Sequence, residues 1–289
     1  MDRVIANGTV VTATGTRRAD VGIRDGRIAE IAERIESGAA DVIDAAGCYV
    51  IPGGIDVHTH LDTPAGPVTT CDDYLSGTVA AACGGTTTIV DFCQQEKGQT
   101  LRDAIATWHA KSEGRSAIDY GFHCIIVDLS DEAFGELAGL PELGVASFKL
   151  FMAYKHLVQV DDLTLLRVLE QAALCGALVM VHAENGDAVY YLQQKLLAAG
   201  KTEPKEHAVS RPPRVEAEAT ARAIALAEIA GAPIYVVQVS CGEALGTNRS
   251  CWPKPALPAT RSSPRRRRGR RAGSGSARRS STRSRAGRS

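Results

Sequence analysis

The sequence lacks the features that mark secreted and membrane-spanning chains. Its 289 residues contain no run of about 18 uncharged apolar residues, the length that a membrane-spanning helix needs. The first residues, MDRVIANGTVV, have no charged segment followed by an apolar one, so no signal peptide is expected. The eight cysteines form no CxxC pair, which favours reduced thiols over a disulfide framework. Together these absences predict a cytoplasmic protein.

Aromatic residues are also scarce, at 5% of the chain, so no platform for stacking nucleic-acid bases is expected. Acidic residues are missing from one end. All 33 Asp and Glu residues precede Thr247, whereas fourteen of the 33 Lys and Arg residues lie from Thr247 onward. The net charge of zero therefore hides an acidic protein joined to a basic tail, residues 247–289.

The tail has a composition that predicts disorder. Residues 261–289 contain only Arg, Ser, Gly, Ala, Pro and Thr, and such a segment buries too little apolar surface to offset its ordering entropy. Clustered arginines would bind polyanions such as nucleic acid non-specifically. A GC-rich gene read out of frame would give the same residues, and the abrupt end of the preceding pattern favours this frameshift interpretation.

The remaining pattern divides near residue 50. Residues 1–50 alternate like short strands, and Asp25-Gly26 predicts a type I′ hairpin turn, so a small β layer is expected. In residues 51–246, six apolar strands alternate with helical stretches, and no GxGxxG follows an early strand. Polar residues end strand after strand. The pattern predicts an α/β fold: an incomplete (β/α)₈ TIM-type barrel of about six βα units.

Two histidines end the first strand of this barrel, in GGIDVHTHLD. Side chains alternate along a strand, so Asp56, His58 and His60 are expected on one face. Two neutral imidazoles on one strand face can bind the same metal ion. Two satisfied core histidines are the alternative, but the His-x-His spacing at the end of an apolar run favours the metal.

Two later strands carry further candidate ligands. Lys149 lies inside the apolar strand SFKLFMA, where desolvation lowers a lysine pKa and leaves a nucleophilic amine. Such an amine can add carbon dioxide to give a carbamate, an anionic ligand able to bridge two metals. A lysine that extends its ammonium group to the strand end is an equally good interpretation of this strand alone. His182 ends the next strand, and the whole set suits two metal ions that hydrolyse amides or esters.

The segments GGIDVHTHLD, AAACGGTTTIVDF, SFKLFMAY and LVMVHAENGD closely resemble the D-hydantoinase/dihydropyrimidinase branch of the amidohydrolase superfamily, up to about Gly246. The resemblance implies a (β/α)₈ barrel beside a small β-sandwich, a homo-oligomer, and two zinc ions that open a cyclic amide ring to an N-carbamoyl amino acid. It implies that His58 and His60 bind one zinc, that His182 binds the second, and that carbamylated Lys149 bridges both. Tyr154 matches the tyrosine that polarises the attacked carbonyl.

The chain departs from this family in two places. Gln238 stands where the family has a histidine ligand, so the second metal should be held less firmly. The pattern also stops before the last two barrel strands, which carry the aspartate that binds the first zinc and transfers a proton. The chain as written is therefore expected to be inactive or nearly so.

Other functions stay open at this stage. Asp62 stands where the dihydroorotase branch has an arginine, and its charge should repel an anionic substrate, which favours hydantoin or dihydropyrimidine rings. An allantoinase-like enzyme is a close alternative, and a non-catalytic scaffold of the same fold is another. The third is nucleic-acid binding by the arginine-rich tail, which only residues 261–289 support.

Overall fold

Two β-sheets organise the part of the chain that the structure describes. The structure is a computed structural model that describes residues 1–36 and 41–251, with side chains described up to Thr247. The predicted disorder of the basic tail, its frameshift origin and its nucleic-acid binding concern residues that lie almost wholly outside this range.

The first sheet comprises five strands from the N-terminal segment, in the order β3-β2-β1-β4 with β5 also paired to β1. The strands are β1 (Arg3–Thr12), β2 (Gly15–Arg24), β3 (Arg27–Ala32), β4 (Asp41–Asp44) and β5 (Tyr49–Val50). Asp25 and Gly26 connect β2 to β3 with φ of 52° and 69°, which confirms the type I′ turn. The described residues supply this one sheet of the β-sandwich that the family resemblance implies.

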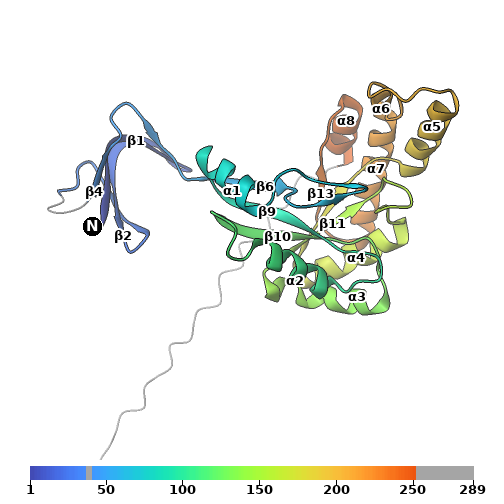
Figure 1. The fold of residues 1–289 in the computed structure, drawn as a ribbon, viewed down its shortest axis with the longest axis horizontal. Coiled ribbons are helices and arrows are strands. Elements are labelled where there is room, and N and C mark those ends of the chain that lie inside the picture. Colours follow the sequence, from blue (N-terminus) through green and yellow to red (C-terminus); the bar gives the residue numbers. More distant parts are fainter. Residues whose placement is uncertain (37–40, 252–289) are drawn as a thin grey trace, which may run out of the picture. The chain divides into compact units, whose positions relative to one another are not determined.

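The second sheet contains six parallel strands in the order β13-β12-β11-β10-β9-β6 (Figure 1). They are β6 (Gly54–Thr59), β9 (Thr86–Gln94), β10 (Asp119–Ile125), β11 (Ser147–Phe151), β12 (Leu178–His182) and β13 (Ile234–Val237). The predicted six βα units are confirmed. A short antiparallel pair, β7 (Pro64–Ala65) and β8 (Val68–Thr69), follows β6. Within the described residues β6 and β13 are the two edges, and Ile55 and Val57 on β6 are 66% and 48% exposed.

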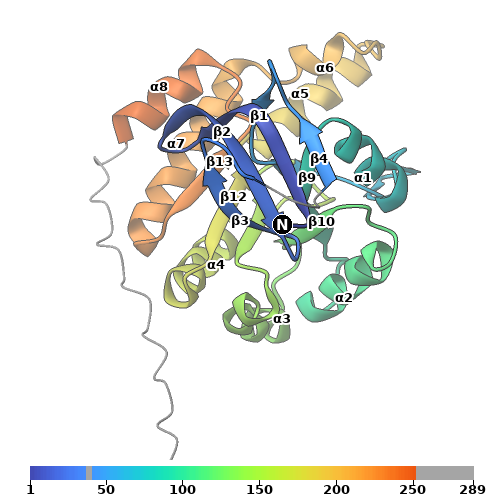
Figure 2. The same cartoon turned by 90° about the vertical axis from the view of Figure 1, so that its left-hand side faces the viewer.

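Helices follow the strands of the parallel sheet and lie in an arc along its outer side (Figure 2). They are α1 (Tyr74–Cys83), α2 (Leu101–Ser112), α3 (Asp131–Glu136), α4 (Asp162–Cys175), α5 (Gly186–Ala198), α6 (Glu206–Val209), α7 (Pro213–Ala230) and α8 (Gly242–Cys251), with 3₁₀ turns η1 (Leu137–Gly139) and η2 (Pro141–Leu143). Polar side chains cap several of them: Asp73, Thr100, Ser130, Asp161 and Asn185 each accept a hydrogen bond from a first-turn N–H. The sequence pattern missed α6 and α8, and α8 continues past Gly246, where the tail was expected to begin.

The two faces of the parallel sheet have different cores. The larger core lies between the sheet and the helices and includes Trp108, Phe148 and Leu165. The opposite, concave face has only a small apolar cluster of Phe92, Ile125, Met180 and Val237, with Val127 and Phe151 packed against it. Because side chains alternate along a strand, the inward-facing positions next to this cluster hold Lys149 and His182. The concave face therefore carries the polar residues that sequence reasoning singled out.

A glycine at the start of α5 tests how tightly the strand ends and helices pack. A methyl group on Gly186 would collide with the carboxamide of Gln159 and lie 2.7 Å from the carbonyl oxygen of Met152. Because backbone cannot yield cheaply, Gly186→Ala should lower the free energy of unfolding by about 1–3 kcal/mol in urea denaturation. Gly135→Ala in α3 is the matched control, since nothing lies within 4 Å of its added methyl. The control should be neutral or stabilising by up to about 1 kcal/mol, and equal losses in both variants would contradict the packing argument.

Candidate metal centre

A cavity of about 680 Å³ opens at the carboxyl ends of the parallel strands, within the size range of ligand sites. Its lining brings together all the residues predicted to hold or assist the metals. They are His58, His60, Lys149, Tyr154 and His182, with Gln238 beside them. No carboxylate lines this cavity within the described residues. The walls therefore offer neutral nitrogen and oxygen donors and one lysine amine.

His58 and His60 face each other at the end of β6. Their ring centroids lie 5.4 Å apart, and the ring of Phe92 on β9 supports both, at 4.7 Å from His58 and 4.8 Å from His60. Desolvation lowers the pKa of both imidazoles, and the nearby Lys149 lowers it further. For His60 the pKa falls to about 4, because the surrounding walls exclude water although part of the ring faces solvent. Both rings are therefore neutral near pH 7, the form that binds metals.

A bulge in β6 sets the position of this pair and corrects one expectation. Asp56 pairs with Ile89 of β9 and Thr59 pairs with Asp91, so β6 has one residue more than β9 between these points. The strict alternation predicted for Asp56, His58 and His60 is therefore interrupted. Asp56 does not line the cavity; its Oδ1 accepts a hydrogen bond from the backbone N–H of His58 at 3.0 Å.

A buried carboxylate holds the chain just after His60. Asp91 on β9 is fully buried and accepts hydrogen bonds from the Tyr74 hydroxyl at 2.6 Å and the Leu61 backbone N–H at 3.2 Å. Burial raises the pKa of Asp91, against the lowering effect of these bonds. Tyr74 begins α1, so this network ties the end of β6 to the first helix of the barrel.

Lys149 extends from β11 into the cavity wall and is 2% exposed. Its Nζ lies 4.8 Å from the ring centroid of Phe151 and 5.4 Å from that of Phe92. No carboxylate pairs with it among the residues the structure describes, and desolvation lowers its pKa to about 8. The amine thus lies at the cavity wall by the strand ends and is kept out of bulk solvent. A neutral fraction of the amine is present near pH 8, as carbamate formation requires.

His182 ends β12 with both ring nitrogens occupied by side chains. Nε2 lies 2.8 Å from Glu184 Oε2, and Nδ1 lies 2.6 Å from the terminal amide of Gln238. Because a carboxylate only accepts, Nε2 donates its hydrogen to Glu184, while the atom of Gln238 that faces Nδ1 is its amide oxygen, Oε1. Glu184 is held in turn by Arg211 at 3.4 Å. A carboxylate that orients a histidine in this way is common next to metal ions, and it directs Nδ1 towards the cavity side that Gln238 occupies.

Tyr154 stands at the cavity rim with its backbone in the left-handed region, at φ 66°. The N–H groups of Leu157 and Val158 both donate to its carbonyl oxygen, at 3.0 and 3.2 Å, and hold this conformation. Its ring lies 5.2 Å from that of His182. Burial and the charge of Glu184 raise the pKa of the Tyr154 phenol, so the hydroxyl stays protonated and can donate a hydrogen bond into the cavity.

Backbone strain is concentrated around this cavity. Six of the described residues other than glycine have positive φ, and two of them, Tyr154 and Gln238, line the cavity. Asp62 and His156 belong to the loops that follow β6 and β11. Non-glycine residues persist in this region only where the surrounding structure enforces it, which is typical of functional sites.

Sequence reasoning missed several residues that support the site. They are Phe92, which packs under the histidine pair, Asp91, which holds the end of β6, His123 on β10, and Glu184. Glu184 lies two residues after His182, and a carboxylate that near a candidate ligand could have been noticed. The others come from neighbouring strands with no local signal in the sequence.

The donor set fits two divalent cations in part. In the described residues no group of three His, Cys, Asp or Glu side chains is arranged to hold a metal ion. A carbamate on Lys149 would change this, since it adds two anionic oxygens between the His58/His60 pair and His182. The buried amine without a counter-charge is the feature that fits such a group best.

The structure contradicts the selectivity role predicted for Asp62. Its side chain is absent from the cavity lining, and its carboxylate lies 3.7 Å from Lys111 Nζ. Lys111 also donates to the Asp62 backbone oxygen at 2.7 Å. The charge is thus largely offset outside the cavity, because the positive φ of 48° turns the loop away.

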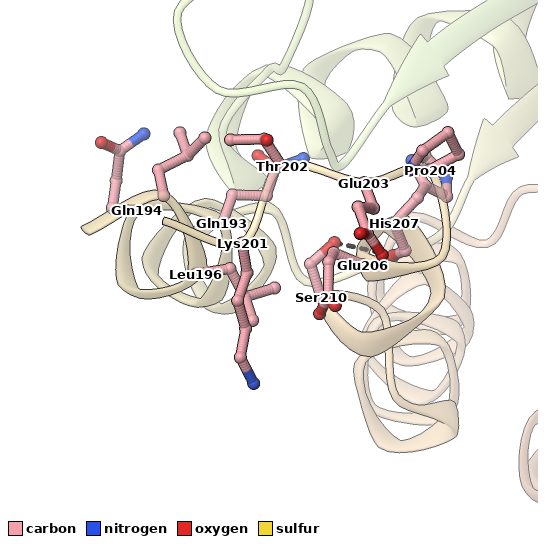
Figure 3. Close-up of a pocket in the computed structure, with 11 residues that line it drawn as sticks. Gln193, Gln194, Leu196, Lys201, Thr202, Glu203, Pro204, Glu206, His207 and Ser210 are labelled. Atoms are coloured by element: carbon pink, nitrogen blue, oxygen red, sulfur yellow. Dashed lines mark hydrogen bonds between the residues drawn. The ribbon is translucent and has the colours of Figure 1, made fainter. Parts of the chain in front are cut away.

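A second hollow, of about 430 Å³, lies between α5 and α6 (Figure 3). Gln193, Lys201, Glu203 and His207 are among the residues that line it, and none of the predicted ligands does. It is an open surface feature in which no three described His or Glu side chains are arranged to hold a metal ion, so the cavity that gathers the predicted ligands is the candidate site.

The chain is similar to known amidohydrolases. A model of the amidohydrolase family matches residues 41–120, and a model of the urease alpha-subunit N-terminal domain matches residues 1–54. A D-hydantoinase of Ralstonia pickettii is 58% identical over 85% of this chain and 53% of that protein. A solved D-hydantoinase structure is 56% identical, with a TM-score of 0.85 over 87% of this chain and 55% of that one.

A dihydropyrimidinase structure from Brevibacillus agri is similar to the same extent, with 50% identity and a TM-score of 0.85 over 87% of this chain and 55% of that one. The neighbours have TIM-barrel folds, so the predicted fold class is confirmed for the described part. The chain spans about half the length of the relatives it matches. No helix in the described residues is long and apolar enough to cross a membrane.

The low pKa of Lys149 predicts an alkaline gain in stability of the metal-free chain. Between about pH 8 and pH 10.5 the unfolded chain binds the Lys149 proton and the folded chain does not, so the free energy of unfolding rises with pH. The full gain is about 3 kcal/mol at most. Urea unfolding at about pH 7 and pH 10, without bicarbonate, should show this rise in the parent chain and a smaller one in Lys149→Met. Identical slopes in the two proteins would show that Lys149 is not desolvated.

Proposed function

Because the chain belongs to the D-hydantoinase/dihydropyrimidinase family of the amidohydrolase superfamily, we propose that its cavity hydrolyses a cyclic amide ring to an N-carbamoyl amino acid. The observation that carries the proposal is the convergence of His58, His60, Lys149 and His182 on one cavity at the strand ends. Chemistry at this end of the strands is the rule for barrels of this type.

The proposed cofactors are two zinc ions. His58 and His60 would hold one and His182 the other, while a carbamate on Lys149 would contact both. Two divalent metals at such a site polarise the amide carbonyl and supply a strong nucleophile from water near neutral pH. The neutral state of the His58 and His60 rings and the low pKa of Lys149 support this assignment, since both are the protonation states that ligation needs.

Tyr154 would donate its hydroxyl hydrogen to the carbonyl oxygen of the ring as negative charge develops there. Its raised pKa keeps the proton on the phenol, and the strained loop fixes its place beside His182. A preorganised donor of this kind stabilises the transition state by about 2.7–4 kcal/mol in other enzymes.

The leaving nitrogen needs a proton, and no carboxylic acid lines the described cavity. A missing general acid lowers rates by roughly 10²–10⁴-fold. We therefore expect the chain as it stands to turn over far more slowly than the 1–10³ per second typical of enzymes.

The proposed substrates are hydantoin and dihydropyrimidine rings, the compounds for which the similar proteins are named. An allantoinase-like activity has no such support among them. A non-catalytic scaffold is disfavoured because a scaffold has no use for a buried, unpaired lysine beside three histidines at one cavity. We keep as proposals a homo-oligomeric state and a cytoplasmic location; the free thiols of Cys93, Cys124 and Cys241 fit the latter.

The decisive experiment measures the carbamate and the metals directly. The chain is loaded with zinc and carbon-13 bicarbonate, and bound zinc, the carbamate signal and hydantoin opening are recorded. Lys149→Ala should lose the carbamate and binuclear binding and at least 10²-fold of any ring opening, while keeping the fold. Short carboxylic acids should partly restore metal binding by occupying the vacated space.

Two bound zinc ions in Lys149→Ala would rule out the carbamate. Failure of the loaded parent chain both to bind zinc with a carbamate signal and to open either hydantoin or dihydrouracil above a metal-free control would remove the proposed function. Lys155→Ala is the matched control, because Lys155 lies just after β11 and outside the cavity lining, and pairs with Asp187.

Gln238 should limit the second metal. A neutral amide oxygen is a weaker ligand than imidazole, so Gln238→His should lower the dissociation constant of the second metal ion. The expected change is at least roughly 10–100-fold, because changes at residues that only hydrogen-bond a metal ligand already have effects of this size. Competition titrations with a zinc chelator measure both steps. The first step should be unchanged, and an unaltered second step would show that residue 238 does not contact the metal.

A further inference from the structure

His123 is a buried histidine that the proposed mechanism does not use. It lies on β10, two strands away from β6, and is 9% exposed on the concave face of the sheet. Its Nε2 lies 3.0 Å from the carbonyl oxygen of Val57, the residue before His58. Its Nδ1 is hydrogen-bonded to the hydroxyl of Ser147, two residues before Lys149. One imidazole therefore connects the strands that carry the histidine pair and the lysine.

The protonation state of His123 follows from its partners. A carbonyl oxygen only accepts, so Nε2 carries a hydrogen and donates it to Val57. Burial lowers the pKa of His123, which leaves the ring neutral and makes Nδ1 an acceptor for the Ser147 hydroxyl. Both ring nitrogens thus have a defined role, and a single tautomer is selected.

The contact falls at the bulge in β6. Val57 and His58 together lie opposite one residue of β9, and a bulge disrupts the regular hydrogen-bond ladder at that point. Two side chains bond the backbone there: Asp56 accepts from the His58 N–H, and His123 donates to the Val57 oxygen. These bonds replace ladder contacts and hold the segment from which the His58 and His60 rings project.

We propose that His123 is a positioning residue, which fixes the bulge of β6 through Val57 and so sets the His58 and His60 rings in the geometry that binds a metal. This inference rests on the proposed function for its purpose, but the contact itself is metal-independent. The neighbouring ring of Phe92, 4.8 Å from that of His123, transmits the same constraint by packing against both His58 and His60.

Three variants separate the bond to Val57 from simple packing. His123→Gln places an amide N–H near the position of Nε2 and should keep the bond. His123→Asn is too short to reach Val57, although it can still bond Ser147. His123→Leu fills the space without any polar group. Val168→Ala, in the core of α4 and outside the cavity, is the control for a general loss of stability.

The first readout is the affinity for cobalt(II) alone, followed by visible absorption. His123→Asn and His123→Leu should bind it about 10–100-fold more weakly than the parent chain. His123→Gln and Val168→Ala should stay within about threefold of the parent, inside ordinary context variation. Equal affinity in the parent, His123→Asn and His123→Leu would overturn the positioning role. A loss in His123→Gln as large as in His123→Leu would assign the effect to ring shape rather than to the bond, which also overturns it.

The second readout needs no metal. Hydrogen exchange of the His58 backbone amide should be slow in the parent and His123→Gln, and faster in His123→Asn. If His123→Leu fails to fold, the Gln and Asn pair still decides the question. A parent chain that binds no cobalt but shows this exchange pattern would remove the proposed function and leave the positioning role intact. Equal exchange rates in the parent, His123→Gln and His123→Asn, together with cobalt binding by the parent, would overturn the positioning role and leave the proposed function in place.

Discussion

A lysine amine buried without a counter-charge dominates the chemistry of the concave face. The Nζ of Lys149 lies between the rings of Phe92 and Phe151, where an isolated ammonium ion is costly and the pKa falls to about 8. The same desolvation keeps His58 and His60 neutral. The cavity therefore presents neutral imidazoles and one amine whose positive charge is costly to bury, a set that would gain most from binding an anion and cations together, as a carbamate with two metals would provide.

The carboxylates near the candidate ligands lie outside the lining of the cavity. Asp56, Asp91 and Glu184 all lie near the candidate ligands, yet each carboxylate is engaged by the protein: Asp56 by the His58 N–H, Asp91 by Tyr74 and Leu61, and Glu184 by His182 and Arg211. Engaged in this way, these groups would orient the candidate ligands and would not themselves bind a metal in the cavity. His123 belongs to the same outer layer, as a neutral donor to Val57. The geometry of the site thus depends on hydrogen bonds between strands as much as on the ligands themselves.

The described barrel segment supplies one side of such a site and leaves positions unfilled. The sheet ends at β6 and β13 within the described residues, and the outward side chains Ile55 and Val57 are exposed there. Gln238 on the loop after β13 bonds His182, where an imidazole would bind a metal more strongly. The free energy of unfolding and the affinity for metal therefore depend on different residues in this chain. Tyr154 and Gln238 are nevertheless held at positive φ, a backbone conformation that persists only where the surrounding structure enforces it.

Local sequence alone determined the order of strands and helices and most of the candidate site. Apolar strands alternating with amphipathic helices predicted the six parallel strands, because hydrophobic period is a local property. His-x-His, the apolar surroundings of Lys149 and the place of His182 after a strand indicated a metal centre, since ligand spacing within a strand is also local. The type I′ turn at Asp25 and Gly26 followed from two residues. The short helices α6 and α8 were missed because they have little periodic pattern of their own.

Only the tertiary structure decided the rest. The bulge in β6, the loop that turns Asp62 towards Lys111, and the contacts of Asp91, His123 and Glu184 join segments far apart in the chain. Such contacts depend on strand register and on the burial of polar groups that must find partners, and neither is written in any one stretch of residues.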